Sequence, residues 1–257
     1  MRKLLPVLAL VIVATCCTTG TRMPGDRPAR ETPSDPLRAF FALCEKDMAR
    51  ATAVIEKRAL IDNLTHLQLM NSGGDRFYLL EREGITEMLR AVTQGNYSDF
   101  ILVNGNGTVI YTMANDDLFA KNLKTYKPDS PLGRCFGGKK APLHLEDVSE
   151  FPRSSGSYRM LIAGNVYRQG VPRGVFIVQI DMEKIFHAAG EGTVIASMDG
   201  LVRVSARSES LMSPLVTDDG AAAWTACARG QVLMGGKART CRVFSYEDLQ
   251  WMVIGGQ

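Results

Sequence analysis

Residues 97–112 constrain the fold of this chain more than any other segment. Their apolar, β-branched and aromatic side chains predict two strands, at 100–103 and 108–111. Between the strands lie Asn104, Gly105, Asn106 and Gly107. These residue types tolerate positive φ angles at low cost and favour a tight turn. The chain is therefore expected to fold around an antiparallel sheet that contains this hairpin.

A long amphipathic helix is expected before the hairpin. Ser34 or Asp35 can cap its first turn, and Pro36 fits the first helical position because the N–H that it lacks needs no partner there. Apolar residues then recur at three- and four-residue spacing from Leu37 to Met70, which predicts one continuous helix of about nine turns. A second helix is expected at 76–93.

The remainder of the chain repeats this order of elements. Further strands are expected at 143–148, 158–167 and 174–180, followed by a helix at 181–189. A second hairpin at 193–204 and three short strands at 231–234, 240–245 and 249–255 then form a reduced copy. Repetition of this kind bears on the whole fold. Both copies indicate an α+β architecture, in which an antiparallel sheet carries helices on one face.

The first 17 residues have the character of an export signal. Two basic residues precede an apolar run at 4–14, which is shorter than the roughly 20 residues of a membrane span. The run ends before Cys16 and resembles the lipobox of bacterial lipoproteins, with Cys17 as a second candidate for lipidation. Thr15 departs from the smaller residue that is usual before the cysteine, and a cleaved signal without a lipid is the alternative. The proline-containing residues 18–35 predict a flexible tether.

Composition and motifs argue against several classes of function. The net charge of +3 and the scattered basic residues argue against nucleic-acid binding. The sequence holds no nucleophile elbow, phosphate-binding loop, dinucleotide fingerprint or zinc-protease motif, so an enzyme is not expected. No Cys-x-x-Cys pair occurs and the three histidines lie apart, so neither a metal site nor a cofactor is expected.

Four cysteines remain after the export signal: Cys44, Cys135, Cys227 and Cys241. An exported compartment permits disulfides. Cys227 and Cys241 flank a glycine-rich turn, so they could face each other across a hairpin. The alternative is that all four are free thiols buried as small apolar residues, because sequence spacing alone does not fix the geometry of a disulfide.

The long helix followed by the 100–111 hairpin resembles the extracytoplasmic Cache sensor domains of bacteria. The first hairpin of that family typically reads apolar, apolar, Val, Asp, two variable residues and Gly, and Asn104 occupies the Asp position here. Asp199, Gly200 and Trp251 resemble positions in the membrane-proximal lobe of a double Cache module. The resemblance implies two PAS-like lobes: a long helix with a membrane-distal lobe at 36–189, and a smaller second lobe at 190–257.

The resemblance also implies a small-molecule pocket in the first lobe, between the sheet and the loops that cover it. Ligands common in the family are amino acids, carboxylates, amines and purine nucleobases. The candidate ligand-binding residues of this sequence are Tyr111, Tyr126, Tyr158, Arg159 and Asp181. Each has a simpler alternative: the tyrosines pack in the sheet, the arginine is a solvated charge, and the aspartate caps a helix. The Arg-x-Trp signature of amino-acid-binding members is missing, since no Trp precedes Trp224.

Together these patterns predict an exported lipoprotein that binds a small molecule and signals through a separate membrane protein, since no second hydrophobic run follows the sensor-like region. The alternative is a structural or adaptor lipoprotein of the cell envelope without a small ligand. An open pocket beside Tyr111 and Arg159 would favour the first interpretation, and a packed first lobe would favour the second.

Overall fold

The computed structural model describes residues 35–70, 75–95, 97–138, 143–150, 158–206 and 211–255. All of them belong to one compact unit, Asp35–Gln257. The expected signal segment 1–17, with Cys16 and Cys17, and the expected tether up to residue 34 lie outside the described residues. No helix in the described part of the chain is both long enough and apolar enough to cross a membrane.

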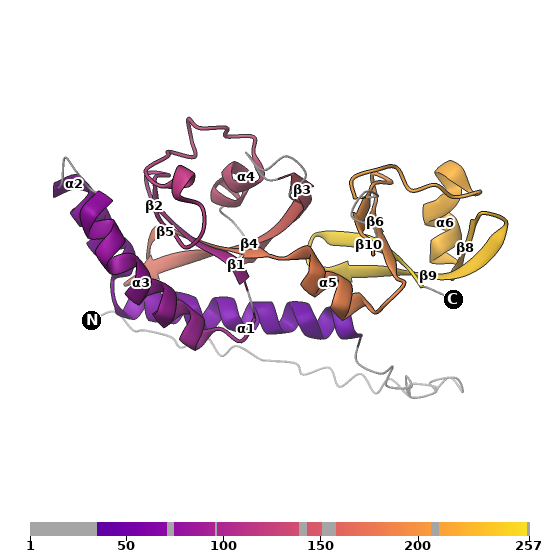
Figure 1. Ribbon diagram of the computed structural model, residues 1–257, viewed down its shortest axis with the longest axis horizontal. Helices are drawn as coiled ribbons and strands as arrows, with labels where there is room; N and C mark the ends of the chain where they lie inside the picture. Colours follow the sequence, from indigo (N-terminus) through magenta and orange to yellow (C-terminus); the bar gives the residue numbers. More distant parts are fainter. Residues whose placement is uncertain are drawn as a thin grey trace, which may run out of the picture. The chain divides into compact units, whose positions relative to one another are not determined.

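Two five-stranded antiparallel sheets form the framework of the protein (Figure 1). The first sheet contains β1 (Tyr97–Asn104), β2 (Val109–Thr112), β3 (Leu143–Glu150), β4 (Tyr158–Arg168) and β5 (Val171–Ile180). The second contains β6 (Val194–Ser197), β7 (Val202–Val204), β8 (Gln231–Met234), β9 (Lys237–Tyr246) and β10 (Leu249–Ile254). The strand orders, β2-β1-β5-β4-β3 and β7-β6-β10-β9-β8, show the same topology twice. The α+β fold and the internal repeat are thus confirmed, and we call the two sheets with their helices the first and second lobes.

Helices cover both faces of the first sheet. The α-helices of the described residues are α1 (Pro36–Lys57), α2 (Leu60–Met70), α3 (Asp75–Val92), α4 (Pro131–Gly137), α5 (Met182–Ala189) and α6 (Ala223–Ala228). Figure 1 shows α1 and α3 on one side of the first sheet, the helix side, and α4 on the other, the cap side. The expectation of helices on one face was wrong for this lobe. Ser130 caps α4 by accepting a hydrogen bond from Gly133 N at 3.2 Å.

The first helix begins where the sequence predicts but ends earlier. Asp35 Oδ1 accepts a hydrogen bond from Leu37 N at 3.1 Å, with Pro36 in the first turn. The prediction of one helix through Met70 was wrong, because α1 ends at Lys57 and Ala59 takes a φ of 49° before α2 starts. A straight continuation would carry α2 about 16 Å further along the axis of α1. The break instead brings Ile61 into the core on the helix side of the sheet.

Both sides of the first sheet are buried, because alternate residues of its central strands point to opposite faces. Phe100, Leu102 and Val178 lie on the helix side, in a core that includes residues of α1, α2 and α3. Ile101, Val103 and Ile177 lie on the cap side and pack against α4 and the chain that precedes it. The near-continuous apolar sequence of β1 and β5 follows from this double burial.

Helix α1 also packs against the second sheet. The ring of Phe41 lies 5.8 Å from Phe244, 5.1 Å from Tyr246 and 5.8 Å from Trp251, measured between ring centres. Aromatic pairs at such separations stabilise by about 0.5–1.5 kcal/mol beyond the area that they bury. One helix thus contributes to the cores of both lobes.

A carboxylate on β3 provides a second connection between the lobes. The pairing of β3 with β4 shifts register around Asp147, and this side chain reaches the strands of the second sheet. It accepts hydrogen bonds from Ser197 Oγ at 2.7 Å, Arg203 Nε at 3.0 Å and Trp251 Nε1 at 3.0 Å. We call these four residues the Asp147 junction.

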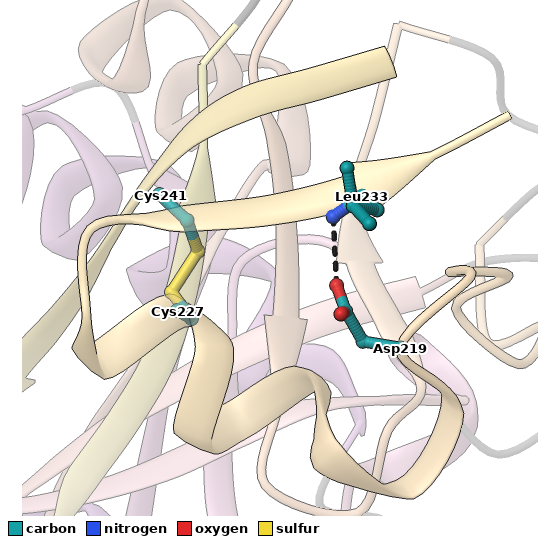
Figure 2. Close-up of a disulfide and its surroundings, with 4 residues drawn as sticks. All are labelled: Asp219, Cys227, Leu233 and Cys241. Carbon is teal, nitrogen blue, oxygen red and sulfur yellow. Dashed lines mark hydrogen bonds between the residues drawn. A yellow bond between two sulfur atoms is a disulfide. The ribbon is translucent and has the colours of Figure 1, made fainter. Parts of the chain in front are cut away.

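The outward backbone groups of three outer strands are engaged within the chain. Val109 of β2 exchanges backbone hydrogen bonds with residues 120 and 121, and Val202 of β7 does so with residues 212 and 213. On β8, Leu233 N donates to Asp219 Oδ2 at 2.7 Å (Figure 2). These contacts cover edges that would otherwise present unpaired N–H and C=O groups.

Figure 2 also shows a disulfide between Cys227 and Cys241. Of the two alternatives, bridge or free thiols, the structure has the bridge, but the bond does not cross a hairpin: Cys227 lies in α6, so it joins a helix to β9. Cys44 and Cys135 are buried free thiols. Burial raises the pKa of Cys44 to about 12, so this thiol stays protonated and unreactive at neutral pH.

A buried carboxylate on α1 fixes the loop that leads from α3 into β1. Asp47 is 1% exposed and accepts hydrogen bonds from Gln94 N at 2.9 Å, Gly95 N at 2.7 Å and Tyr97 Oη at 3.0 Å. Arg50 of the same helix forms an ion pair with it. Burial alone would raise the pKa of Asp47, but these hydrogen bonds outweigh burial and hold the pKa below its ordinary value.

We expect Asp47→Asn to lower the free energy of unfolding by about 2 kcal/mol at pH 7, because an amide cannot accept all of these hydrogen bonds. The pKa of Asp47 is lower in the folded than in the unfolded state. Its stabilisation is therefore present above the unfolded-state pKa and is lost as the pH falls through the folded-state value. Urea unfolding of the two proteins should show their difference shrinking below about pH 4. A difference that stays constant from pH 7 to pH 3 would contradict this assignment.

Candidate functional site

The cap of the first lobe is the segment 113–138, and a buried carboxylate on β1 fixes its start. Asp99 is 0% exposed and accepts hydrogen bonds from Met113 N at 2.8 Å, Ala114 N at 3.0 Å and Thr112 Oγ1 at 2.9 Å. Asn115 Nδ2 is a further donor. Burial raises the pKa of Asp99, and these hydrogen bonds oppose the shift without cancelling it.

An ion pair fixes the other end of the cap to the edge of the sheet. Arg134 of α4 donates from Nε to Glu146 Oε1 of β3 at 2.8 Å. His144 Nε2 lies 3.4 Å from the second oxygen of the same carboxylate. Burial would raise the pKa of Glu146, but its bonds to His144 and Arg134 outweigh burial and lower the pKa. The cap is thus held at both ends by charged groups of the sheet.

The middle of the cap side is filled by apolar side chains. Leu118, Leu123, Leu132 and Phe136 of the cap are buried against Ile101, Val103, Leu161 and Ile177 of the sheet. Five hollows formed by described residues are not lined by Tyr111, Tyr126, Tyr158, Arg159 or Asp181. The centre of the cap side is thus packed with apolar side chains, and a hollow of about 250 Å³ opens beside Phe136 and Val175.

Polar residues replace apolar ones at one end of the cap side. Across the sheet, Asp99 of β1 lies opposite Gln179 of β5, which in turn lies opposite Leu161 of β4. Leu161 lies opposite Glu146 of β3. Arg159 is two residues from Leu161 on the same strand and hence on the same face. We call Asp99, Gln179, Arg159 and Glu146 the polar end of the cap side.

Gln179 has an unused hydrogen-bond acceptor at this polar end. The residue is 5% exposed, and its buried Oε1 has no hydrogen-bond partner among the described residues. Arg159 occupies the diagonal position on the neighbouring strand, where side chains start about 7–8 Å apart. Arg159 is half-buried, and its Nη1 donates a hydrogen bond to the backbone oxygen of Tyr158 at 3.1 Å.

The structure does not gather the five candidate ligand-binding residues into one site. Tyr126 and Arg159 lie on the cap side. Tyr111 and Tyr158 lie on the helix side, where the Tyr111 hydroxyl is 2.7 Å from Thr86 Oγ1 of α3. Asp181 caps α5 and accepts a hydrogen bond from Glu183 N at 3.3 Å.

Sequence reasoning missed Asp99 and Gln179. Each borders an apolar run of its strand, Phe100–Val103 in β1 and Val175–Val178 in β5, and a polar residue at such a place could have marked them. What the sequence lacks is the register that places them opposite each other, because strand pairing is decided by distant segments.

The polar end offers complementary groups for a small polar molecule. The Gln179 carbonyl can accept a hydrogen bond from an N–H or O–H group, and the buried Asp99 carboxylate beside it favours a positive charge. The Arg159 guanidinium suits a carboxylate. Within the described segments, no three His, Cys, Asp or Glu side chains come together in a way that could hold a metal ion.

Comparison by sequence finds no relative: neither a protein-family model nor a curated protein matches this chain. Comparison of structures does find similar folds. The extracellular ligand binding receptor from Desulfohalobium retbaense matches with a TM-score of 0.57 and 12% identity. The match covers 85% of this chain but only 38% of that one.

The sensor domain of the V. cholerae histidine kinase DctB matches with a TM-score of 0.56 and 15% identity. This match covers 87% of this chain and 94% of that one. The match thus extends over most of both chains, while the low identity carries no information on ligand or partner. The chain therefore has the double Cache-like fold, in which a long N-terminal helix is followed by two PAS-like lobes.

Proposed function

We propose that this protein is an exported sensor module that binds a small polar molecule at the polar end of the cap side. The observation that carries this proposal is the buried Gln179 Oε1, which has no partner among the described residues. Buried polar atoms of this kind are rare in native proteins, and a bound ligand is one way to satisfy them. Asp99 on one side and Arg159 on the other favour a molecule that carries both an amine and a carboxylate.

A thermal-shift screen of amino acids, carboxylates, amines and nucleobases tests this proposal. A ligand at about 100 times its Kd adds about 2.7 kcal/mol to the stability. For a chain of this size that raises the melting temperature by about 5–10 °C. Gln179→Leu should remove the shift while keeping the unliganded protein stable, because it replaces an unpaired polar group with an apolar one of similar volume.

Arg159→Gln should lower the affinity for ligands that carry a carboxylate and leave the affinity for other ligands unchanged. Arg90→Gln is the matched control, because it removes one exposed positive charge from the end of α3. If no compound raises the melting temperature at saturating concentration, the ligand proposal fails.

We further propose that the chain is anchored to the bacterial membrane by a lipid on Cys16 and that its signal leaves through a separate membrane protein. The lipobox-like segment and the flexible composition of residues 18–34 support the anchor. The disulfide of the second lobe supports an oxidising compartment. Metabolic labelling with palmitate should mark the wild type but not Cys16→Ser, and labelling that persists would point to Cys17.

A second candidate is an adaptor of the cell envelope that binds another protein and no small molecule. The apolar packing at the centre of the cap side favours it, because a filled lobe leaves little room for a ligand. Cross-linking and purification from solubilised membranes would recover a partner under either proposal. A recovered partner together with a negative ligand screen would select the adaptor.

A further inference from the structure

A hollow of about 330 Å³ opens at the far end of β1 from Asp99. It lies between α2, the β1–β2 turn and the hairpin of β4 and β5, and we call it the hairpin hollow. Thr65 and His66 line it from α2, Asn104 from the turn, and Arg173 from the β4–β5 hairpin. Asn104 and Asp99 are five residues apart on one strand, about 17 Å, so this hollow is separate from the polar end of the cap side.

The amide of Asn104 is fixed with its donor group unused. The residue is 5% exposed, and its Oδ1 accepts hydrogen bonds from Asn106 N at 3.1 Å and Thr108 N at 3.0 Å. Two N–H donors identify this atom as the oxygen and so orient the amide. No hydrogen bond within the described residues engages the Nδ2 group, which is therefore left as a pre-oriented donor.

A second polar group at the hollow is also without a partner. Thr65 Oγ1 is buried and has no hydrogen-bond partner among the described residues. A hydroxyl can donate as well as accept. This hydroxyl is closed to solvent, so the open donor of the hollow is the Asn104 amide.

Arg173 and Asp62 are the oppositely charged residues that line the hollow, and Arg168 binds the same carboxylate from outside the lining. The carboxylate of Asp62 is bound by Arg168 Nη1 at 2.6 Å, whereas Arg173 Nε lies 3.8 Å from its other oxygen. Two guanidinium groups therefore share one carboxylate. His66 is exposed, and no ion pair joins it to another described residue.

From the free Asn104 donor and from Arg173, whose guanidinium is 3.8 Å from a carboxylate that Arg168 binds more closely, we propose that the hairpin hollow binds a small oxyanion, a carboxylate or a phosphate. Arg173 supplies the charged contact, and Asn104 Nδ2 supplies a neutral donor. The site does not rest on the proposed sensor function, because it uses different residues at the opposite end of the strand.

Titration of the ¹⁵N-labelled protein with inorganic phosphate or succinate, at constant ionic strength, tests this site. We expect a saturable shift of the Asn104 side-chain amide. Asn104→Asp keeps an oxygen for the turn but replaces the donor with a negative charge, so it should weaken binding by at least about tenfold. Arg173→Gln should do the same, and the spectra themselves show whether each variant is folded.

Arg90→Gln, which removes a positive charge from α3, is the matched control and should bind as the wild type does. Sedimentation with phosphatidylglycerol vesicles separates the two sources of the anion. If the wild type binds the vesicles and Arg173→Gln does not, the ligand is a lipid headgroup. If the wild type binds only the free anions, the ligand is a soluble anion. Binding to neither source, or equal binding by Asn104→Asp, would overturn the proposal.

Discussion

Asp147→Ala is expected to lower the free energy of unfolding by about 3 kcal/mol. The substitution removes the acceptor of the Trp251 indole, which is 0% exposed, and one of the two carboxylates that bind Arg203, whose side chain is 8% exposed. A buried donor without a partner costs about 1–3 kcal/mol, and breaking a buried ion pair costs about 3–5 kcal/mol. Because Asp199 still binds Arg203, the lower end of the second range applies.

Urea unfolding followed by circular dichroism measures this effect. Glu87→Ala, which removes an exposed carboxylate from α3, should change the stability by less than about 0.5 kcal/mol. Trp251→Phe keeps an aromatic ring and removes only the indole donor. A double-mutant cycle between Asp147→Ala and Trp251→Phe should therefore show a coupling of about 1 kcal/mol. A loss no larger than that of Glu87→Ala would show that the Asp147 junction does not hold the lobes together.

Removal of the disulfide should have a comparable effect. Cys227 and Cys241 are 14 positions apart, and closing a loop of that size stabilises by about 3 kcal/mol. We expect the double variant Cys227→Ala, Cys241→Ala to melt about 6–12 °C lower than the wild type. The alanines avoid placing a polar group among the buried residues of the second lobe.

A reducing agent provides the internal control for this prediction. Dithiothreitol should lower the melting temperature of the wild type and leave the double variant unchanged, since the buried Cys44 and Cys135 form no bridge. Equal melting temperatures of both proteins, with and without dithiothreitol, would show that the bridge does not contribute to stability in solution.

The hairpins could be predicted from the sequence because their signals are local. A glycine-asparagine turn between β-branched and aromatic residues decides the structure within about a dozen positions, as at β1 and β2. The second hairpin, around Gly200, follows the same rule. The repeat of topology then followed from recognising the same order of elements twice.

The break between α1 and α2 could not be predicted, because what it achieves is the burial of Ile61 against residues that lie far away in sequence. Ala59 carries no turn signal, and its positive φ is stabilised by what the redirected helix buries. Helix α4 is different, since Ser130 and Pro131 form a recognisable start that sequence reasoning overlooked.

The candidate ligand-binding residues do not form one site, because alternate residues of a strand point to opposite faces of the sheet. Tyr111 lies opposite Leu102, and both point to the helix side, whereas a ligand under the cap needs residues of the other parity such as Asp99 and Gln179. A shift of one residue exchanges the faces of a strand. Sequence alone identified the strands but not which of their faces the cap would cover.

The covered outer strands limit how this protein can bind another protein. With β2 paired to residues 120–121, β7 to residues 212–213 and β8 held by Asp219, a partner cannot extend either sheet at these edges by adding a strand of its own. Neighbouring copies crowded on a membrane surface would likewise be prevented from joining edge to edge there. Recognition at these places must rely on side chains, so a partner surface should be found by substituting exposed residues rather than by searching for complementary strands.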